Sequence, residues 1–261
     1  MGIIRHEIVG DRVIHGEGTR LEEWRTCEIL QQMPEFDIPQ VIPPDARICI
    51  IAPHPDDEIL GCGGLIQRLD KLGYQIVLFA VTNGTASHPG SSLYTPEELN
   101  QIRPAETRAA LEALPLKQNI LRIALDIQDG KVAEQRDLLQ QHLQSYLQPN
   151  DVLITTFVHD GHPDHEITGQ VTQQLATELN LACIQVLIWA WHWATPGDTR
   201  IPWSVAHQLR LTEEELQYKS IAARCFKSQL ELDPTTEQAA ILPEQALQRL
   251  LQPWEVYLYE Q

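Results

Sequence analysis

Apolar runs and amphipathic stretches alternate along most of the chain, and this alternation predicts a sheet covered by helices. Five β-rich apolar runs end at turn residues, at 47–53, 75–84, 119–125, 151–157 and 183–191. Amphipathic stretches of helical length lie between them, at 59–72, 96–114, 132–147 and 166–179. Because continuously apolar runs are typical of strands buried on both faces, we expect a doubly wound, Rossmann-like α/β fold, with a mostly parallel sheet and helices on both faces.

The two ends of the chain depart from this alternation. Residues 1–46 contain a polar helical stretch at 19–33 and then a proline-rich segment at 34–46, whose composition indicates an extended connector. We expect 1–46 to be an N-terminal extension that packs on a single domain at 47–261. Near the C-terminus, the pattern predicts helices over 213–230 and 242–251 and an edge strand over 254–260.

Composition and charge narrow the classes of partner. The formal net charge of −17, from 36 acids against 19 Lys plus Arg, argues against nucleic acid and anionic membrane surfaces as partners. No apolar run reaches the roughly 18 to 20 residues that a membrane helix needs, and the first residues lack the apolar core of a signal peptide. We therefore expect a cytoplasmic protein without a membrane span, either monomeric or a homo-oligomer. The five widely spaced cysteines form no C-x-x-C pair and are expected to be reduced thiols.

The stretch "HPDDE" at 54–58 places a histidine and three acids directly after the first predicted strand. In a parallel sheet, ligands bind beyond the carboxyl ends of the strands. Pro55 restricts the backbone on both sides, so the neighbouring side chains are held in a stiff turn. Helix capping alone would explain any single acid here, because the helix dipole favours a carboxylate at this end by up to about 1 kcal/mol.

A second cluster, "HDGHPDHE" at 159–166, follows the fourth predicted strand in the equivalent position. Two His/Asp clusters at the same end of one sheet favour a shared metal site over two separate helix caps. Histidine nitrogens and carboxylate oxygens suit a catalytic zinc, which has three protein ligands and leaves a position for water. The metal would acidify that water, and a neighbouring carboxylate could take the proton.

These residues resemble the signature of the PIG-L/LmbE family of metal-dependent N-deacetylases. "APHPDDE" at 52–58 is similar to the family pattern (A/S)-x-H-P-D-D-E, and "HPDH" at 162–165 is similar to its H-P-D-H. Two shorter matches lie between these motifs, "RPAETRAALEAL" at 103–114 and "IQDGKV" at 127–132, and a third lies downstream, "KSIAARCFKSQ" at 219–229. The resemblance covers about residues 47–230 and implies the same α/β fold.

The resemblance also implies roles for individual residues. His54, Asp57 and His165 would bind the metal, either Zn²⁺ or Fe²⁺, since His/carboxylate sites accept both. The catalytic residues would be Asp56 as general base, His162 as an imidazolium that stabilises the oxyanion or protonates the leaving amine, and Asp164 as the group that orients His162.

Substrate contacts are expected from four residues. The resemblance places Arg103 and Asp129 where the family contacts substrate. His192 and Trp193, in the aromatic stretch at 189–203, are expected to contact a sugar or an apolar aglycone, whereas Trp189 is expected to pack in the interior. Phe226 departs from the histidine or tyrosine of many relatives, so a polar role at that position is lost.

The reaction that the resemblance implies is hydrolysis of an N-acetyl group from an N-acetylglucosamine-type conjugate, releasing acetate and a free amine. An amidase that acts on a thiol conjugate or on a longer N-acyl chain would share the same metal site. A metal-binding module without catalysis is a third alternative, although Asp56 is retained as a base. A nucleotide-binding Rossmann domain is disfavoured, because no G-x-G-x-x-G follows the first strand. The glycines of "GCGG" at 61–64 are expected instead to permit close packing of a helix.

Overall fold

A seven-stranded sheet is the centre of the computed structural model, which describes residues 10–236 and 238–259. The strand order is β3-β2-β1-β4-β5-β7-β6, and β1 to β5 are parallel. The strands are β1 (Arg47–Ala52), β2 (Gln75–Ala80), β3 (Leu121–Ala124), β4 (Asp151–Thr156), β5 (Ala182–Val186), β6 (Ala206–Arg210) and β7 (Trp254–Leu258). The mostly parallel, doubly wound sheet predicted from the sequence is therefore confirmed.

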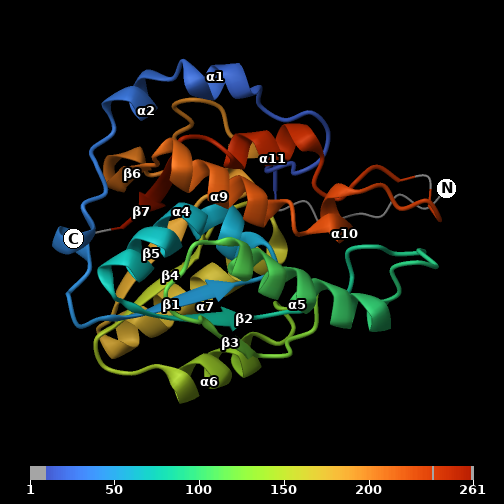
Figure 1. Cartoon of the computed structure of the whole chain (residues 1–261), viewed down its shortest axis with the longest axis horizontal. Helices are drawn as coiled ribbons and strands as arrows, with labels where there is room; N and C mark the ends of the chain where they lie inside the picture. Colours follow the sequence, from blue (N-terminus) through green and yellow to red (C-terminus); the bar gives the residue numbers. More distant parts are fainter. Residues whose placement is uncertain (1–9, 237, 260–261) are drawn as a thin grey trace.

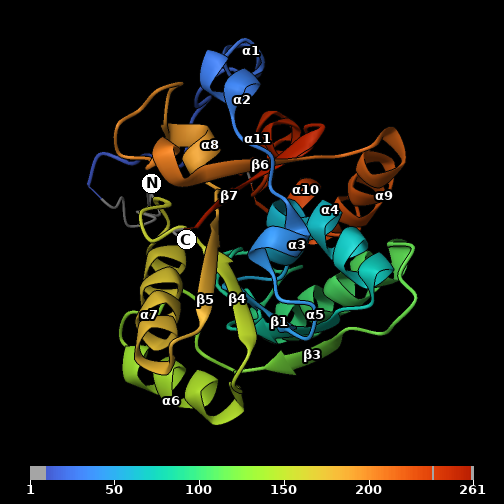
Figure 2. The same cartoon turned by 90° about the vertical axis from the view of Figure 1, so that its left-hand side faces the viewer.

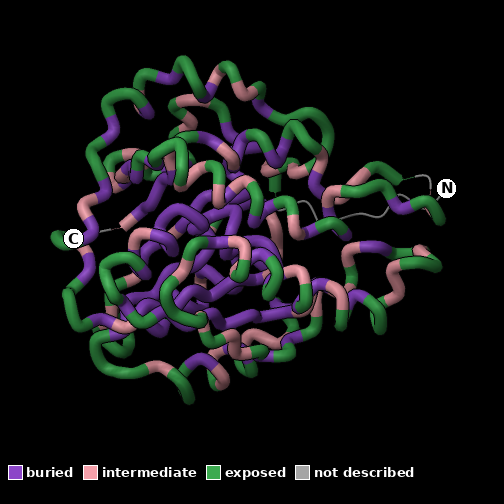
Figure 3. Tube along the Cα trace, in the orientation of Figure 1, coloured by how far each residue is buried: buried purple, intermediate pink, exposed green. Residues whose placement is uncertain are grey.

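Helices cover both faces of this sheet (Figure 1). One layer holds α4 (Asp57–Leu72), α5 (Pro96–Ala113) and α9 (Glu213–Ala223), and the other holds α6 (Arg136–Tyr146) and α7 (Pro163–Leu179). Alternate residues of β1 pack against the two helix layers, because successive strand side chains point to opposite faces of the sheet. Ile48 and Ile50 pack with the first layer, while Cys49 and Ile51 pack with the second. In Figure 3 the buried residues accordingly follow the sheet.

The remaining helices are short, and several differ from the prediction. They are α1 (Leu21–Arg25), α2 (Glu28–Gln32), α3 (Ile38–Val41), α8 (Ala190–Trp193), the 3₁₀ helix η1 (Trp203–Val205), α10 (Lys227–Leu230) and α11 (Glu244–Leu250). The helix predicted over 19–33 is divided at Thr26 and Cys27, and the one over 213–230 is divided after Ala223. The strand predicted over 183–191 ends at Val186, because the chain turns into α8.

The predicted edge strand at the C-terminus is wrong in its position. β7 lies inside the sheet, antiparallel to both β5 and β6, and β6 is the edge strand. Residues 206–210, "AHQLR", follow a proline-containing loop and carry too brief an alternation to predict a strand. The chain therefore forms one more strand than the pattern predicts.

Residues 20–46 lie against the β6 and β7 side of the sheet (Figure 2). The ring centroids of Trp24 and Trp191 lie 4.9 Å apart, and those of Phe36 and Tyr257 lie 4.7 Å apart. The backbone N–H of Phe36 also donates to the carbonyl oxygen of Gln208 on β6. These contacts place the described part of the N-terminal segment in the main core, while the division into an extension and a domain stays a prediction.

The glycines of α4 permit close packing, as expected. A Cβ on Gly61 would lie 2.8 Å from Val186, and one on Gly63 would lie 2.9 Å from Lys219. Cys62 between them is buried, and all five cysteines are free thiols. The helix that begins at Asp57 is thus pressed against the sheet, which fixes the direction of the acids at its start.

Candidate active site

The two His/Asp clusters meet at the carboxyl ends of β1 and β4. These strands are parallel neighbours, with Ile51 opposite Thr155 near their ends. The strand order reverses between them, since β2 lies on one side of β1 and β5 lies beyond β4. Such a switch point leaves a crevice for ligands in open α/β sheets. The turn that carries His54 and the first turn of α7, which carries His165, therefore converge, as the sequence predicts.

Three predicted ligand atoms lie close together. His54 Nδ1 is 3.1 Å from His165 Nε2, and Asp57 Oδ2 is 3.5 Å and 3.3 Å from these two nitrogens. Ligand atoms at about 2.1 Å from a tetrahedral ion lie about 3.4 Å apart, so the three spacings fit a zinc-sized ion. All three side chains are nearly or fully buried, and the donor set of two imidazoles and one carboxylate matches the chemistry of such an ion.

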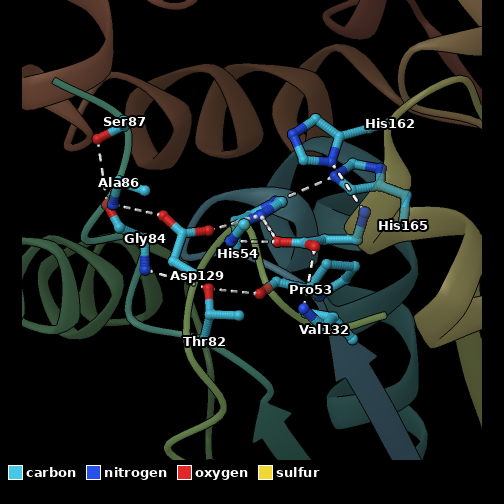
Figure 4. Close-up of polar contacts among 12 residues, drawn as sticks. Pro53, His54, Thr82, Gly84, Ala86, Ser87, Asp129, Val132, His162 and His165 are labelled. Carbon is cyan, nitrogen blue, oxygen red and sulfur yellow. Dashed lines mark hydrogen bonds and ion pairs between the residues drawn. The ribbon is translucent and has the colours of Figure 1, made fainter. Parts of the chain in front are cut away.

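Carboxylates hold the other nitrogen of each histidine. His54 Nε2 lies 3.1 Å from Asp129 Oδ1, and His165 Nδ1 lies 2.8 Å from Asp160 Oδ2 (Figure 4 shows His54, Asp129 and His165). A carboxylate on the outer nitrogen fixes the tautomer and direction of a metal-binding histidine. Asp129, expected to contact substrate, lines the cavity, contacts His54 and accepts the backbone N–H of Ala86 at 2.7 Å.

Two other groups around His54 are close enough to hold an ion. One combines His54 with His162 and His165, and the other combines it with Asp129 and Asp164. The second would use the His54 nitrogen that already faces both acids, at 3.1 and 3.4 Å. We favour the group with Asp57 over the second, because there both histidines keep their carboxylate partners.

Asp160 was missed by the sequence reasoning. It is fully buried, and its carboxylate accepts the backbone N–H groups of Ile188, Trp189 and Ala190 at 2.9 to 3.1 Å as well as His165. Its place in the cluster 159–166 indicated that it lies near the site. Its contact with His165 spans a turn, however, and follows no periodic spacing that a sequence pattern could reveal. Asp160 joins a site histidine to the start of α8.

Asp56 has a strained backbone and a raised pKa. Its φ is +129°, a region that non-glycine residues rarely adopt and that occurs at functional sites. Arg103 Nη2 lies 3.2 Å from Asp56 Oδ2, and Glu58 Oε2 accepts the Asp56 backbone N–H. Burial raises the pKa of Asp56 to about 8, with Arg103 opposing the shift and Asp57 and Glu58 adding to it. A cation at the neighbouring histidines would favour the ionised form that a base needs.

Arg103, another expected substrate contact, is a buried partner of the Asp56 turn. Besides Asp56, its guanidinium donates to the carbonyl oxygens of Pro55 and Gly84 at 2.6 and 3.2 Å. Gly84 adopts φ +65°, and a side chain there would collide with the guanidinium. Arg103 also lines the cavity, so it faces both the candidate base and the space where substrate would lie.

His162 and Asp164 differ from their expected relation. Asp164 Oδ2 lies 3.4 Å from His54 Nε2 and accepts the Gly130 N–H at 2.8 Å, so its carboxylate does not orient His162. His162 Nδ1 instead accepts the Asp164 backbone N–H at the start of α7. Burial, then His54 and His165, lower the pKa of His162 well below its ordinary value, and because Nδ1 accepts a hydrogen bond, a neutral ring carries its proton on Nε2.

A cavity of about 360 Å³ opens beside these groups, and its far wall is apolar. The lining includes Leu60, Ile188, Trp189, Trp191, Ile241, Leu242, Ala246 and Leu250. His192 lines it, but its Nδ1 and Nε2 lie 3.1 Å from Arg249 and 3.4 Å from the His15 carbonyl oxygen. Trp193, expected to contact substrate, donates to the Asp160 carbonyl oxygen and lies outside the described cavity wall, whereas Trp189 lines it.

We predict that the metal-free protein loses thermal stability as the pH rises from about 6.5 to about 9. Burial opposes the charge of His165, but Asp57 and Asp160 outweigh it and raise the pKa to about 9. A pKa raised by folding stabilises the protein below the unfolded value of about 6.5, and this contribution is lost as the pH passes the folded value. The raised pKa of Asp56 acts in the same direction. Melting temperatures of chelator-treated protein across this range test it; a constant or rising value would contradict it.

Comparison with known proteins identifies the region that carries the site. The family model for PIG-L, described as GlcNAc-PI de-N-acetylase, matches residues 49–176, which contain both motifs. Diacetylchitobiose deacetylase from Thermococcus kodakarensis is 28% identical over 127 residues, which are 47% of this chain and 46% of that protein. A probable N-acetyl-alpha-D-glucosaminyl L-malate deacetylase 2 from Bacillus cereus is 28% identical over 141 residues, 52% of this chain and 63% of that protein. The chain thus spans about half the length of the curated relatives it matches.

A solved structure has the same fold. N,N'-diacetylchitobiose deacetylase from Pyrococcus horikoshii, in complex with its inhibitor, superposes with a TM-score of 0.55 and 22% identity over 76% of each chain. The match agrees with the observed sheet and helices. Together with the two motifs, the family match confirms the predicted resemblance: residues 49–176 match the PIG-L family model.

Proposed function

We propose that this protein is a metal-dependent N-deacetylase that hydrolyses the N-acetyl group of an N-acetylglucosamine-type conjugate. One observation carries the proposal: His54 Nδ1, Asp57 Oδ2 and His165 Nε2 lie 3.1 to 3.5 Å apart, beside the buried carboxylate of Asp56. The two curated relatives support it, since both are named as deacetylases of N-acetylated sugars. A cytoplasmic location stays an expectation from the sequence.

His54, Asp57 and His165 would hold the ion, for which zinc and ferrous iron are the candidates. Such an ion, when bound, supplies an acidified water and polarises the acyl oxygen. The donor atoms of this chain keep their directions because Asp129 and Asp160 hold the outer histidine nitrogens. The ligand set therefore needs little reorganisation on binding.

The remaining groups handle protons and charge. Asp56, once ionised, would accept the proton of the attacking water and could later return it to the leaving amine. His162 would donate a hydrogen bond from Nε2–H to the oxyanion, because its Nδ1 is already an acceptor for the Asp164 N–H. Arg103 would hold the Asp56 carboxylate in place through its 3.2 Å contact.

The replacement Asp160→Asn is expected to weaken metal binding by about 10- to 100-fold. The amide can offer its oxygen or its nitrogen to His165 Nδ1, but it lacks the charge that favours the metal-binding tautomer. Affinity measured by competition with a chelator tests this, and Asp45→Asn, an exposed carboxylate between α3 and β1, is the matched control. Unchanged affinity in Asp160→Asn would show that the carboxylate does not support the site.

The proposed function is tested by an assay of amine release. Purified protein loaded with zinc or with ferrous iron is incubated with N-acetylglucosamine conjugates that carry different aglycones, and with longer N-acyl and thiol-conjugate analogues. Release of acetate with an equal amount of amine, abolished by a chelator, is the expected result. Hydrolysis only of the longer-acyl or thiol conjugates would favour the amidase alternative. Stoichiometric metal without hydrolysis of any amide would favour a metal-binding module.

A further inference from the structure

Arg249 is a buried cation in the wall of the candidate active-site cavity. It lies on α11, is 6% exposed, and lines the cavity together with Ala246 and Leu250. α11, in the C-terminal part of the chain, lies beside α1 and α8 (Figures 1 and 2). This part falls outside residues 49–176, so the wall is not supplied by the matched family region.

The charge of Arg249 has no carboxylate partner within residues 10–236 and 238–259. Its guanidinium contacts only neutral acceptors there: the carbonyl oxygens of Thr19 and Glu17 and, at 3.1 Å, Nδ1 of His192. These bonds use three of its five N–H groups, which leaves one N–H on each terminal nitrogen. Arg103, the other cavity arginine, differs in having Asp56 as an ion-pair partner.

An uncompensated buried charge is costly, and native structures ordinarily pair it. The surroundings increase that cost, because the neighbouring wall formed by Leu242, Ala246 and Leu250 is apolar. The same apolar surroundings would strengthen the attraction to an incoming anion. A guanidinium with free donors on both terminal nitrogens matches two oxygen atoms of one anionic group.

We propose that Arg249 binds an anionic oxygen group of the substrate, a carboxylate or a phosphate carried by the conjugate, while the amide lies at His54, Asp57 and His165. This inference rests on the proposed function and names a class of substrate for it. The anionic group would lie against the apolar wall, so a conjugate that combines charge with apolar surface would fit best.

The test compares three conjugates of equal size whose aglycones end in a neutral amide, a carboxylate or a phosphate. For the unmodified protein we expect kcat/KM to be about 10- to 100-fold higher for an anionic conjugate, the range of a charge-assisted hydrogen bond in a buried site. In Arg249→Gln this ratio should fall toward one, and in Arg249→Lys part of it should remain. Arg224→Gln, which removes an exposed arginine paired with Glu244, should leave the ratio unchanged.

Calorimetry measures the binding of the same conjugates and of their amine products. It separates the proposed deacetylase reaction from the proposed anion site at Arg249. If no conjugate is hydrolysed but the anionic ones bind more tightly through Arg249, the proposed reaction fails and the anion site stands. If all three conjugates are hydrolysed with equal kcat/KM and bind with equal affinity, the inference is wrong. Arg249 would then only hold residues 17–19 and α8 against α11. A difference between the carboxylate and phosphate arms identifies the anion.

Discussion

Replacing Asp56 with asparagine is expected to lower kcat by about 10²- to 10⁴-fold while the bound metal is retained. Asparagine keeps the shape of the side chain and tolerates positive φ, so the turn at φ +129° should form. The amide cannot accept a proton from water, and it also removes the buried negative charge beside Arg103. Turnover and metal content, measured on the same preparation, test both halves of the prediction.

A matched control separates this loss from a general effect of removing an acid. Asp137→Asn changes an exposed aspartate in the first turn of α6, away from the cavity, and should leave kcat and metal content unchanged. Near-normal turnover of Asp56→Asn would exclude Asp56 as the base. Loss of the metal together with turnover would instead make Asp56 a ligand or a support of the site.

The convergence of the clusters at 54–58 and 159–166 could be predicted because two simple rules apply to them, whereas the choice of His54, Asp57 and His165 within them came from the resemblance. Apolar runs locate the strands, and the carboxyl ends of neighbouring parallel strands lie at one edge of the sheet. The residues directly after β1 and β4 therefore meet without any knowledge of side-chain packing. The same reasoning predicted the turn at Pro55 and the close packing of "GCGG", since both depend on local backbone restrictions.

The partners of the two histidines could not be predicted, because their contacts depend on how turns and distant segments fold. Asp129 reaches His54 from the loop after β3, and Asp160 reaches the start of α8. No periodicity encodes such contacts. The expected pairing of Asp164 with His162 failed for a related reason: the Asp164 carboxylate faces the opposite way, toward Gly130 and His54.

The apolar wall was the least predictable part of the site. Trp189 and Trp193 are the same residue type in one aromatic stretch, so the sequence does not distinguish them. Only the turn of the chain into α8 makes Trp189 line the cavity, while Trp193 donates a hydrogen bond to the Asp160 carbonyl oxygen. Arg249 lies on a helix that the sequence did predict, at 242–251, yet its burial depends on the N-terminal segment folding back over it. The candidate cavity wall therefore depends on tertiary contacts, whereas the candidate metal ligands follow local rules.

Replacing His165 with alanine is expected to lower the affinity for zinc by more than about 100-fold, since loss of a supporting carboxylate alone costs about 10- to 100-fold. The variant leaves His54 and Asp57 without the third donor and leaves Asp160 without its imidazole partner. Because a ligand stabilises the state that binds it, added zinc should raise the melting temperature of the unmodified protein and not that of His165→Ala. His159→Ala, an exposed histidine in the same cluster, is the matched control and should keep both effects. Unchanged zinc content in His165→Ala would exclude this ligand and shift the site to the group formed by His54, Asp129 and Asp164.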